Sequence, residues 1–370
     1  MRSAITEARR IVIKIGSSSL TGKAGERLDP VSIDHLVDVV ADLKKRGKEV
    51  IIVSSGAIAA GIAPLGLTKR PTDLATQQAA AAVGQGLLIH RYTESCARYS
   101  ITASQVLLTI EDVIRRSHYQ NAQRTLLKLI SLGVLPVINE NDSVGTQEIR
   151  FGDNDRIAAL VSHLVNADLL VLVTDVSALF DMNPHDPRAQ RIAEVSRIDE
   201  IADAAITGVG SSGVGSGGMV TKVDAARIAT GAGIATVLTS LAHVGEALRG
   251  ENVGTFFHPA SSKKSSRLLW LQHAATVRGR IVVDAGAMAA LRERGVSLLP
   301  AGVTAVEGEF IAGDTVEIIG PDRDVIARGL VAFDSDEIPR MMGRSTKDLA
   351  KEFGPEYERE LIHRDDLVVM

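Results

Sequence analysis

Two lysines stand beside glycine-rich and serine-rich segments, and together they point to phosphate chemistry. Lys222 follows a glycine run at residues 213–219 (GVGSGGM) and lies in the first turn of the helix that this run opens. Lys14 lies in an apolar run at residues 11–15 and is followed by Gly16 and three serines. Free backbone N–H groups at a helix N-terminus attract anions. Two lysines placed in this way can hold both sides of a polyphosphate, which predicts phosphoryl transfer.

The glycine run does not fit the two common nucleotide-binding fingerprints. Residues 208–218 match G-x-G-x-x-G twice, but residues 198–206 before them have a helical pattern, so no strand leads into the first glycine. A Walker A loop is excluded because no Gly-Lys-Ser/Thr sequence follows. We interpret the run as an anion-binding loop; the alternative is a mobile glycine loop with a solvated lysine.

The position of Lys14 within an apolar strand is informative. Burying a lysine is costly unless it meets an anion. Alternation along residues 11–15 (IVIKI) places Ile11 and Ile13 on one face, and Val12 and Lys14 on the other. The alternative is a lysine at the strand end whose ammonium reaches water.

Carboxylate and amide side chains gather in a third segment, residues 153–155 (Asp-Asn-Asp), just before a predicted helix. Asp155 would make a good N-cap of that helix, which is a structural explanation for part of the cluster. The cluster also suits the water shell of Mg²⁺ or an amino-acid substrate. Glu140 and Asp142 follow a neighbouring strand and could hold an ammonium group.

Strand and helix patterns alternate through the first 250 residues. Predicted strands lie at 11–15, 49–54, 103–108, 134–139, 169–174 and 235–238, and predicted helices at 30–46, 76–99, 121–131 and 155–166. This alternation predicts an α/β fold, a three-layer sandwich with a mostly parallel sheet. Polar residues follow four of the strands, at 16–18, 54–57, 139–142 and 174–175. Ligands bind beyond the carboxyl ends of such strands, so we expect the site there.

The pattern changes near residue 255. We predict a catalytic domain at 1–258, a linker at 259–275 and a small β-rich domain, a barrel or a sandwich, with a C-terminal tail at 276–370. Its predicted strands lie at 279–283, 302–307, 315–319 and 325–331, with a helix at 287–294. Residues 276–370 carry 12 Lys/Arg and 18 Asp/Glu, a balance of −6, and the remainder carries +2.

Composition sets further limits. Aromatic residues make up only 3% of the 370 residues, so the core must be built from Ala, Val, Ile and Leu, which suits buried parallel strands. The single cysteine, Cys96, excludes an internal disulfide and a cysteine metal cluster. The nine histidines lack ligand spacing, so we expect no zinc site. Because no signal-peptide run precedes residue 11 and no segment has about 20 apolar residues, we expect a soluble, cytoplasmic protein without membrane partners.

Six segments resemble the bacterial glutamate 5-kinase family, in the family's order. They are 13–17 (IKIGS), 53–61 (VSSGAIAAG), 136–142 (PVINEND), 151–155 (FGDND), 172–175 (LVTD) and 215–222 (GSGGMVTK). The resemblance covers almost the whole chain, and the segment from about residue 276 resembles a PUA domain, which this family often carries. Ser17 and Ser54 stand where threonine is frequent in the family, so a hydroxyl is kept.

The resemblance implies an amino acid kinase-like fold and ATP-dependent phosphorylation of the side-chain carboxylate of L-glutamate, the first step of proline biosynthesis, with ATP and Mg²⁺. It implies that Lys14 and Lys222 stabilise charge on the transferred phosphoryl group, and that Asp153 or Asp155 organises the lysines and Mg²⁺. The residues implied for ATP are Lys14, Gly16, Ser17, Thr174, Asp175, Ser216, Gly217, Gly218, Met219, Val220, Thr221 and Lys222. Those implied for glutamate are Ser55, Gly56, Ala57, Asp142 and Asn154. It assigns no metal ligand.

The resemblance also implies partners. Proline is the expected feedback inhibitor, competing at or near the glutamate site. The product is a labile acyl phosphate, so handover to glutamate-5-semialdehyde dehydrogenase is a hypothesis. Most members of the superfamily are not monomers, which implies a homo-oligomer.

Two alternatives remain. The acceptor could instead be aspartate, N-acetylglutamate, carbamate or a nucleoside monophosphate, but residues 139–142 and 151–155 together with the PUA-like tail argue against these. A function from another class is RNA binding by the C-terminal domain, which the balance of −6 disfavours because the phosphate backbone is negative.

Overall fold

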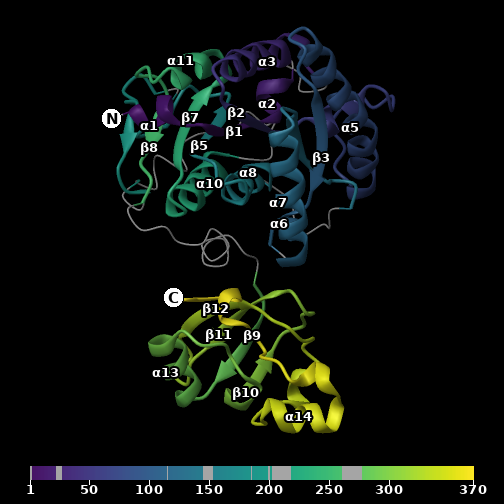
Figure 1. Cartoon of the computed structure of the whole chain (residues 1–370), viewed down its shortest axis with the longest axis vertical. Helices are drawn as coiled ribbons and strands as arrows, with labels where there is room; N and C mark the ends of the chain where they lie inside the picture. Colours follow the sequence, from purple (N-terminus) through teal and green to yellow (C-terminus); the bar gives the residue numbers. More distant parts are fainter. Residues whose placement is uncertain are drawn as a thin grey trace. The chain divides into compact units, whose positions relative to one another are not determined.

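A computed structural model describes residues 2–21, 27–114, 116–144, 153–184, 186–198, 201, 218–260 and 277–370 (Figure 1). For residues 114, 116, 117 and 153 it describes the backbone alone. The chain divides into two compact units, Met1–Lys263 and Lys264–Met370.

The first unit contains an eight-stranded sheet with the strand order β3-β4-β2-β1-β5-β7-β8-β6. The strands are β1 (Arg10–Ile15), β2 (Glu49–Ser54), β3 (Ala103–Leu108), β4 (Leu135–Glu140), β5 (Leu169–Thr174), β6 (Glu194–Val195), β7 (Ala235–Ser240) and β8 (Thr255–Phe257). Strands β1 to β5 and β7 run parallel, and β8 runs antiparallel to β7. The predicted mostly parallel sheet is confirmed, and each of its six predicted strands agrees with an observed strand to within two residues.

Helices cover both faces of this sheet (Figure 1). They are α1 (Ser3–Glu7), α2 (Ser17–Leu20), α3 (Pro30–Lys45), α4 (Ala57–Ile62), α5 (Leu74–Ala97), α6 (Ile110–Ile114), α7 (Arg116–Ser131), α8 (Asp153–Leu164), α10 (Met219–Gly231) and α11 (Val244–Leu248), with a 3₁₀ turn η2 (Leu241–His243). The two long helices of one face begin at aspartates: Asp29 caps α3 by accepting from Val31 N, and Asp73 caps α5 by accepting from Thr76 N.

The side chains of β1 alternate between two layers, as its sequence predicts. Ile11, Ile13 and Ile15 are fully buried in a core shared with α3, α5 and α11. The opposite parity turns Lys14 toward α8, where it meets Asp155. The alternation therefore places Lys14 on the α8 side of β1, between the apolar residues Ile13 and Ile15.

Helices α4 and α5 pack closely enough that only glycine fits at their contact. A Cβ added to Gly84 would lie 1.7 Å from the carbonyl oxygen of Ala57, and one added to Gly61 would lie 1.9 Å from that of Ala80. Gly86, two residues along α5, has nothing within 4 Å of such a Cβ. Glycine therefore fixes how near α5 lies to the segment that follows β2.

This difference gives a matched pair of variants. We expect Gly84→Ala to lower the free energy of unfolding by about 1–3 kcal/mol, because the added methyl forces the two helices apart. Gly86→Ala should raise it by up to about 1 kcal/mol, because alanine favours an exposed helix. Urea denaturation of both variants measures this, and a Gly84→Ala variant as stable as Gly86→Ala would contradict the packing.

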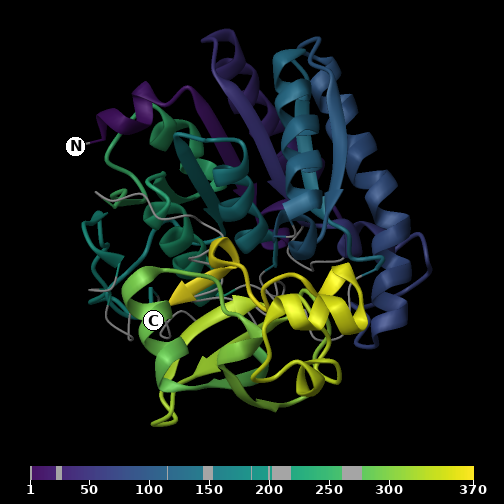
Figure 2. The ribbon, with the colours of Figure 1, turned by 60° about the horizontal axis from the view of Figure 1, so that its bottom comes forward.

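The second unit contains a five-stranded sheet with the order β10-β9-β11-β12-β13. Its strands are β9 (Val277–Val283), β10 (Val303–Glu307), β11 (Thr315–Ile319), β12 (Val325–Leu330) and β13 (Leu367–Val369), and its helices are α13 (Ala285–Arg294), α14 (Thr346–Phe353) and the 3₁₀ turns η3 (Pro300–Gly302), η4 (Ile338–Arg340), η5 (Pro355–Tyr357) and η6 (Arg364–Asp366). Helices α13 and α14 flank the sheet (Figures 1 and 2). The predicted β-rich unit is confirmed; the short β13 and the helix α14 were not predicted.

Cys96 is fully buried on α5, and burial raises the pKa of its thiol to about 11. In the described parts of the chain, no helix combines the length and the apolar character needed to cross a membrane.

Candidate functional site

The order of the strands determines where a ligand can bind. From β1 the chain builds β2, β4 and β3 on one side, and then crosses to build β5 and β7 on the other side. Parallel sheets bind ligands at the carboxyl ends of the strands where this direction reverses. Here that point lies between β1 and β5, so the segments after β1, β2, β4 and β5 surround the candidate site.

Two lysines and one carboxylate meet at this point. Lys14 Nζ lies 2.6 Å from Asp155 Oδ1, and Lys222 Nζ lies 3.4 Å from Asp155 Oδ2. Lys14 is 4% exposed, Lys222 6% and Asp155 0%. The hydroxyl of Thr221 lies 2.8 Å from the same Oδ2. We call Lys14, Lys222 and Asp155 the lysine–aspartate triad.

The charges of the triad follow from this geometry. Burial acts to raise the pKa of Asp155, but the attraction of Lys14 and Lys222 outweighs it and holds that pKa below its usual value. Burial lowers the pKa of Lys14, and the attraction of Asp155 opposes this shift. An ionised carboxylate at 2.6 Å favours the protonated lysine. Two cations sharing one anion leave positive charge in excess, which an anionic ligand would balance.

Asp155 does not have the structural role that the sequence offered for it. Helix α8 begins at Asp153, so Asp155 is its third residue, and the expectation of an N-cap is wrong. Its carboxylate is instead held by lysines from β1 and α10. Of the two aspartates considered as organisers of the lysines, Asp155 makes the contacts; the side chain of Asp153 lies outside the described part of the chain.

The described residues implied for ATP lie on or directly after β1 and β5, and at the start of α10. Gly16 N donates to the carbonyl of Val173 (3.3 Å), which joins the exits of β1 and β5, and Thr174 donates to the carboxylate of Asp175 (2.9 Å). Ser17 opens α2. Gly218 is the N-cap of α10, whose first turn contains Met219, Val220, Thr221 and Lys222. Ser216 and Gly217 lie outside the described residues.

The residues implied for glutamate lie on the other side of β1. Ser55 N donates to the carbonyl of Ile15 (3.1 Å), which joins the exits of β2 and β1. Gly56 has a φ of 106°, which residues with a side chain rarely adopt, and Ala57 is the first residue of α4. Asn154 precedes Asp155 in α8, and Asp142 is half-buried after β4. The structure thus groups Ser55, Gly56, Ala57 and Asn154 on or beside two elements of the triad, strand β1 and helix α8.

Amide side chains join two of these segments. Asn154 Nδ2 donates to Asn139 Oδ1 (3.1 Å), and Glu140 N donates to both Asn139 Oδ1 (2.8 Å) and Asn154 Oδ1 (3.2 Å). Behind them, Gln85 of α5 accepts from Asn139 Nδ2 at 3.2 Å. Sequence reasoning missed Gln85; its only signal is a polar residue between two glycines in an apolar helix.

Sites for a metal ion are limited. Among the described residues, no three or more His, Cys, Asp or Glu side chains are grouped to hold a metal ion. Mg²⁺ that arrives with ATP takes its ligands mostly from phosphate and water, and needs only one or two carboxylates. Asp175, exposed at the end of β5 within the implied ATP segment, is a carboxylate of this kind.

Both units of the chain are similar to known protein families. Residues 9–240 match the amino acid kinase family and residues 279–353 match the PUA domain. Proteins called glutamate 5-kinase are 58% identical to it in Streptomyces avermitilis and 57% identical in Thermobifida fusca, over 100% of this chain and 98% and 95% of theirs. Among solved structures, a carbamate kinase from Giardia lamblia bound to AMP-PNP has a TM-score of 0.49 at 19% identity, covering 69% of this chain and 100% of that one.

The two family matches and the full-length relatives agree with the mostly parallel sheet of the first unit and with the β-rich second unit. The chain therefore belongs to the amino acid kinase family and, within it, to the glutamate 5-kinases with a PUA domain.

Proposed function

We propose that the lysine–aspartate triad is the centre at which this chain transfers the γ-phosphoryl group of ATP to the side-chain carboxylate of L-glutamate. The reaction is that of the family to which the chain belongs, and it begins proline biosynthesis. The observation that carries the assignment to this site is the pair of nearly buried lysines that share one carboxylate at the carboxyl ends of parallel strands.

The acceptor explains why the triad lacks a general base. A glutamate side chain has a pKa of about 4.3, so it is an ionised nucleophile at neutral pH. Phosphoryl transfer to it then requires in-line placement of the two substrates and neutralisation of charge. Lysines supply this neutralisation, whereas a hydroxyl acceptor would also need a residue to take its proton.

The two lysines come from different elements, which suits a transferred group that moves between two sites. Lys14 is on β1, between the implied ATP and glutamate segments, and Lys222 is on α10 after the glycine run. Asp155 holds both ammonium groups at fixed positions. Groups fixed before the reaction stabilise the transition state without reorganising during it.

We assign ATP to the segments after β1 and β5 and at the start of α10, and glutamate to Ser55–Ala57, Asp142 and Asn154. Bound Mg²⁺ would neutralise phosphate charge and orient the phosphates. Asp175 would face it from the end of β5.

The test is an ADP-release assay of the full-length protein with Mg²⁺-ATP and L-glutamate, in which hydroxylamine traps the acyl phosphate. L-Aspartate and N-acetyl-L-glutamate are run beside it. We expect hydroxamate from L-glutamate alone. Hydroxamate from either other acceptor in its place would keep the triad but overturn the assigned substrate.

The same assay addresses regulation. If proline competes at the glutamate site, added proline should raise the KM for glutamate and leave the KM for ATP unchanged.

We also propose that the protein is a homo-oligomer and that its labile product passes to glutamate-5-semialdehyde dehydrogenase. Light scattering tests the first, and the rate of the coupled reaction on mixing tests the second.

A further inference from the structure

Helix α5 presents two buried polar side chains toward the strand exits that hold the acceptor. Gln85 is 6% exposed and Tyr92 is 0% exposed. They stand seven residues apart, which is two helical turns, so they lie on the same face of α5. Each contacts a different segment of the candidate site, and neither touches the lysine–aspartate triad in the described contacts.

Tyr92 acts on the segment after β2. Its hydroxyl lies 3.0 Å from Ser54 Oγ, and Ser54 Oγ donates to the carbonyl of Ser55 at 3.0 Å. A carbonyl can only accept, so the single proton of Ser54 goes to Ser55, and Tyr92 must donate to Ser54. Burial raises the pKa of Tyr92 above its ordinary value, which keeps that proton in place.

This chain of donors fixes one peptide group. The Ser55 carbonyl is held by Ser54, and Ser55 N is held by Ile15 O at 3.1 Å. In a planar trans peptide the following N–H points opposite to the carbonyl, so the direction of Gly56 N–H is fixed as well. Ser55 and Gly56 are residues that we assign to glutamate.

Gln85 acts on the segment after β4. Its Nε2 donates to the carbonyl of Glu140 (3.0 Å), and its Oε1 accepts from Asn139 Nδ2 (3.2 Å). The two contacts determine which end of each amide carries oxygen. Asn139 Oδ1 then faces Asn154 Nδ2 at 3.1 Å, so the orientation of the Asn154 amide is fixed in turn.

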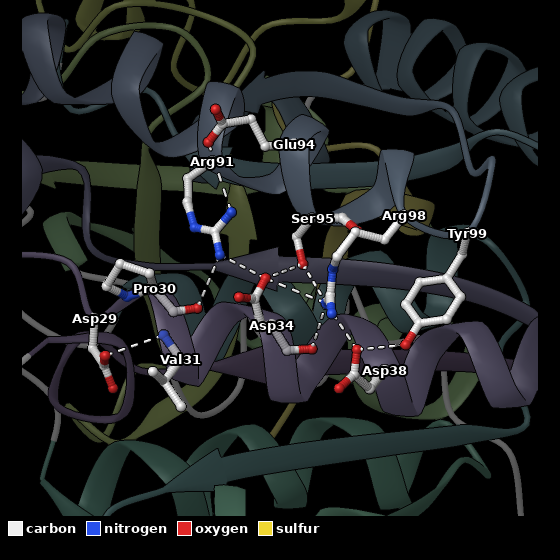
Figure 3. A network of polar contacts seen from close by, with 10 residues as sticks. All are labelled: Asp29, Pro30, Val31, Asp34, Asp38, Arg91, Glu94, Ser95, Arg98 and Tyr99. Carbon is white, nitrogen blue, oxygen red and sulfur yellow. Dashed lines mark hydrogen bonds and ion pairs between the residues drawn. The ribbon is translucent and has the colours of Figure 1, made fainter.

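Helix α5 is itself held against α3 (Figure 3). Asp34 of α3 lies 2.6 Å from Arg91 and 3.3 Å from Arg98, and it accepts from Ser95 at 2.6 Å. Asp38 accepts from Arg98 and from Tyr99, each at 2.8 Å. The close contact at Gly84 holds α5 against α4. Asp34 keeps its contacts with both arginines when the Ser95 hydroxyl is removed, so the position of α5 does not depend on that hydroxyl.

We propose that Gln85 and Tyr92 are positioning residues for the phosphoryl acceptor. Tyr92 orients the Ser55–Gly56 peptide group, and Gln85 orients the side-chain amide of Asn154. Both act through a side chain of an adjoining strand exit, and neither contacts the acceptor. This inference rests on the proposed assignment of Ser55, Gly56 and Asn154 to glutamate.

The test compares Tyr92→Phe and Gln85→Met with the wild type, as full-length proteins, in the hydroxamate assay. Each variant keeps the size of the side chain and removes its hydrogen bonds. We expect each to raise the KM for L-glutamate about tenfold, the effect of one lost hydrogen bond of ordinary strength. The KM for ATP should stay within twofold of the wild-type value.

Ser95→Ala is the matched control. Like Tyr92→Phe, it removes one buried hydroxyl from α5, but that hydroxyl bonds to Asp34 of α3. Its KM for glutamate should therefore remain at the wild-type value. Thermal unfolding of all three variants shows whether they lose comparable stability.

Three results are decisive. A wild-type KM for glutamate in both Tyr92→Phe and Gln85→Met overturns the inference, and so does an equal rise in the KM of ATP. A tenfold rise in Ser95→Ala also overturns it, because loss of stability alone would then explain the effect. If the wild type forms no glutamate-dependent hydroxamate, the proposed function itself has failed, and this is known before any variant is compared.

Discussion

Replacing Lys222 with methionine should lower kcat about a hundred- to a thousandfold, the usual effect of removing one fixed group that stabilises transition-state charge. The free energy of unfolding should not fall. Lys222 is one of two cations around Asp155, so its removal leaves the Lys14–Asp155 contact of 2.6 Å as a neutral pair. Methionine also fills most of the space of the lysine stem. Steady-state kinetics and urea denaturation of the same preparation measure both effects.

The control for this variant is Lys44→Met. Lys44 is a half-buried lysine, more exposed than Lys222; it lies in the last turn of α3 and donates to the carbonyl of Gly133, before the start of β4. That is the opposite edge of the sheet from the triad, so its kcat should equal that of the wild type. If Lys222→Met keeps a kcat within threefold of Lys44→Met, the triad is not the centre of phosphoryl transfer.

Asp155→Asn should be the most destabilising change in the site. Removing one partner of a buried ion pair typically costs about 3–5 kcal/mol, because a charge is left buried and unbalanced. Here two lysines, 4% and 6% exposed, lose the carboxylate that they share. Activity should be lost together with stability, in contrast to Lys222→Met, which should lose activity alone.

The destabilisation of Asp155→Asn should depend on pH with a definite sign. Burial lowers the pKa of Lys14 in the wild type, and Asp155 opposes this, so the variant should have a still lower folded-state pKa. Between that value and the unfolded lysine pKa of about 10.4, the unfolded chain binds more protons than the folded chain. Stability of the variant therefore rises with pH in this window. The wild-type Lys14 pKa is lowered less, so the deficit of the variant against wild type should shrink as the pH rises from the Lys14 pKa of the variant toward that of the wild type. Urea denaturation of both proteins over a pH series measures this, and a deficit that stays constant from neutral to alkaline pH would contradict the role of Asp155.

Much of the fold could be predicted from local sequence. The bounds of β2, β3 and β5 agree with the predicted strands. The sequences of β2 and β5 are largely apolar runs of strand length between polar or helical segments. The face of Lys14 followed from the alternation of five residues. The location of the candidate site could also be predicted, because polar residues directly follow the strands and the carboxyl ends of parallel strands lie at one edge of the sheet.

The sequence by itself determined the six parallel strands of the first unit, the parity of β1 and the identity of the two lysines, since these depend on neighbours within a few residues. Only the tertiary structure decided the partners. In the sequence, Asp155 has the position expected of a helix N-cap. In the fold, its carboxylate contacts both lysines, because α8 and α10 pack on the Lys14 side of β1. Gln85 and Tyr92 gain their roles in the same way, through Asn139 and Ser54 on strands β4 and β2. Such contacts join segments far apart in the chain, and their geometry is set by strand order and helix packing, which no local pattern of residues encodes.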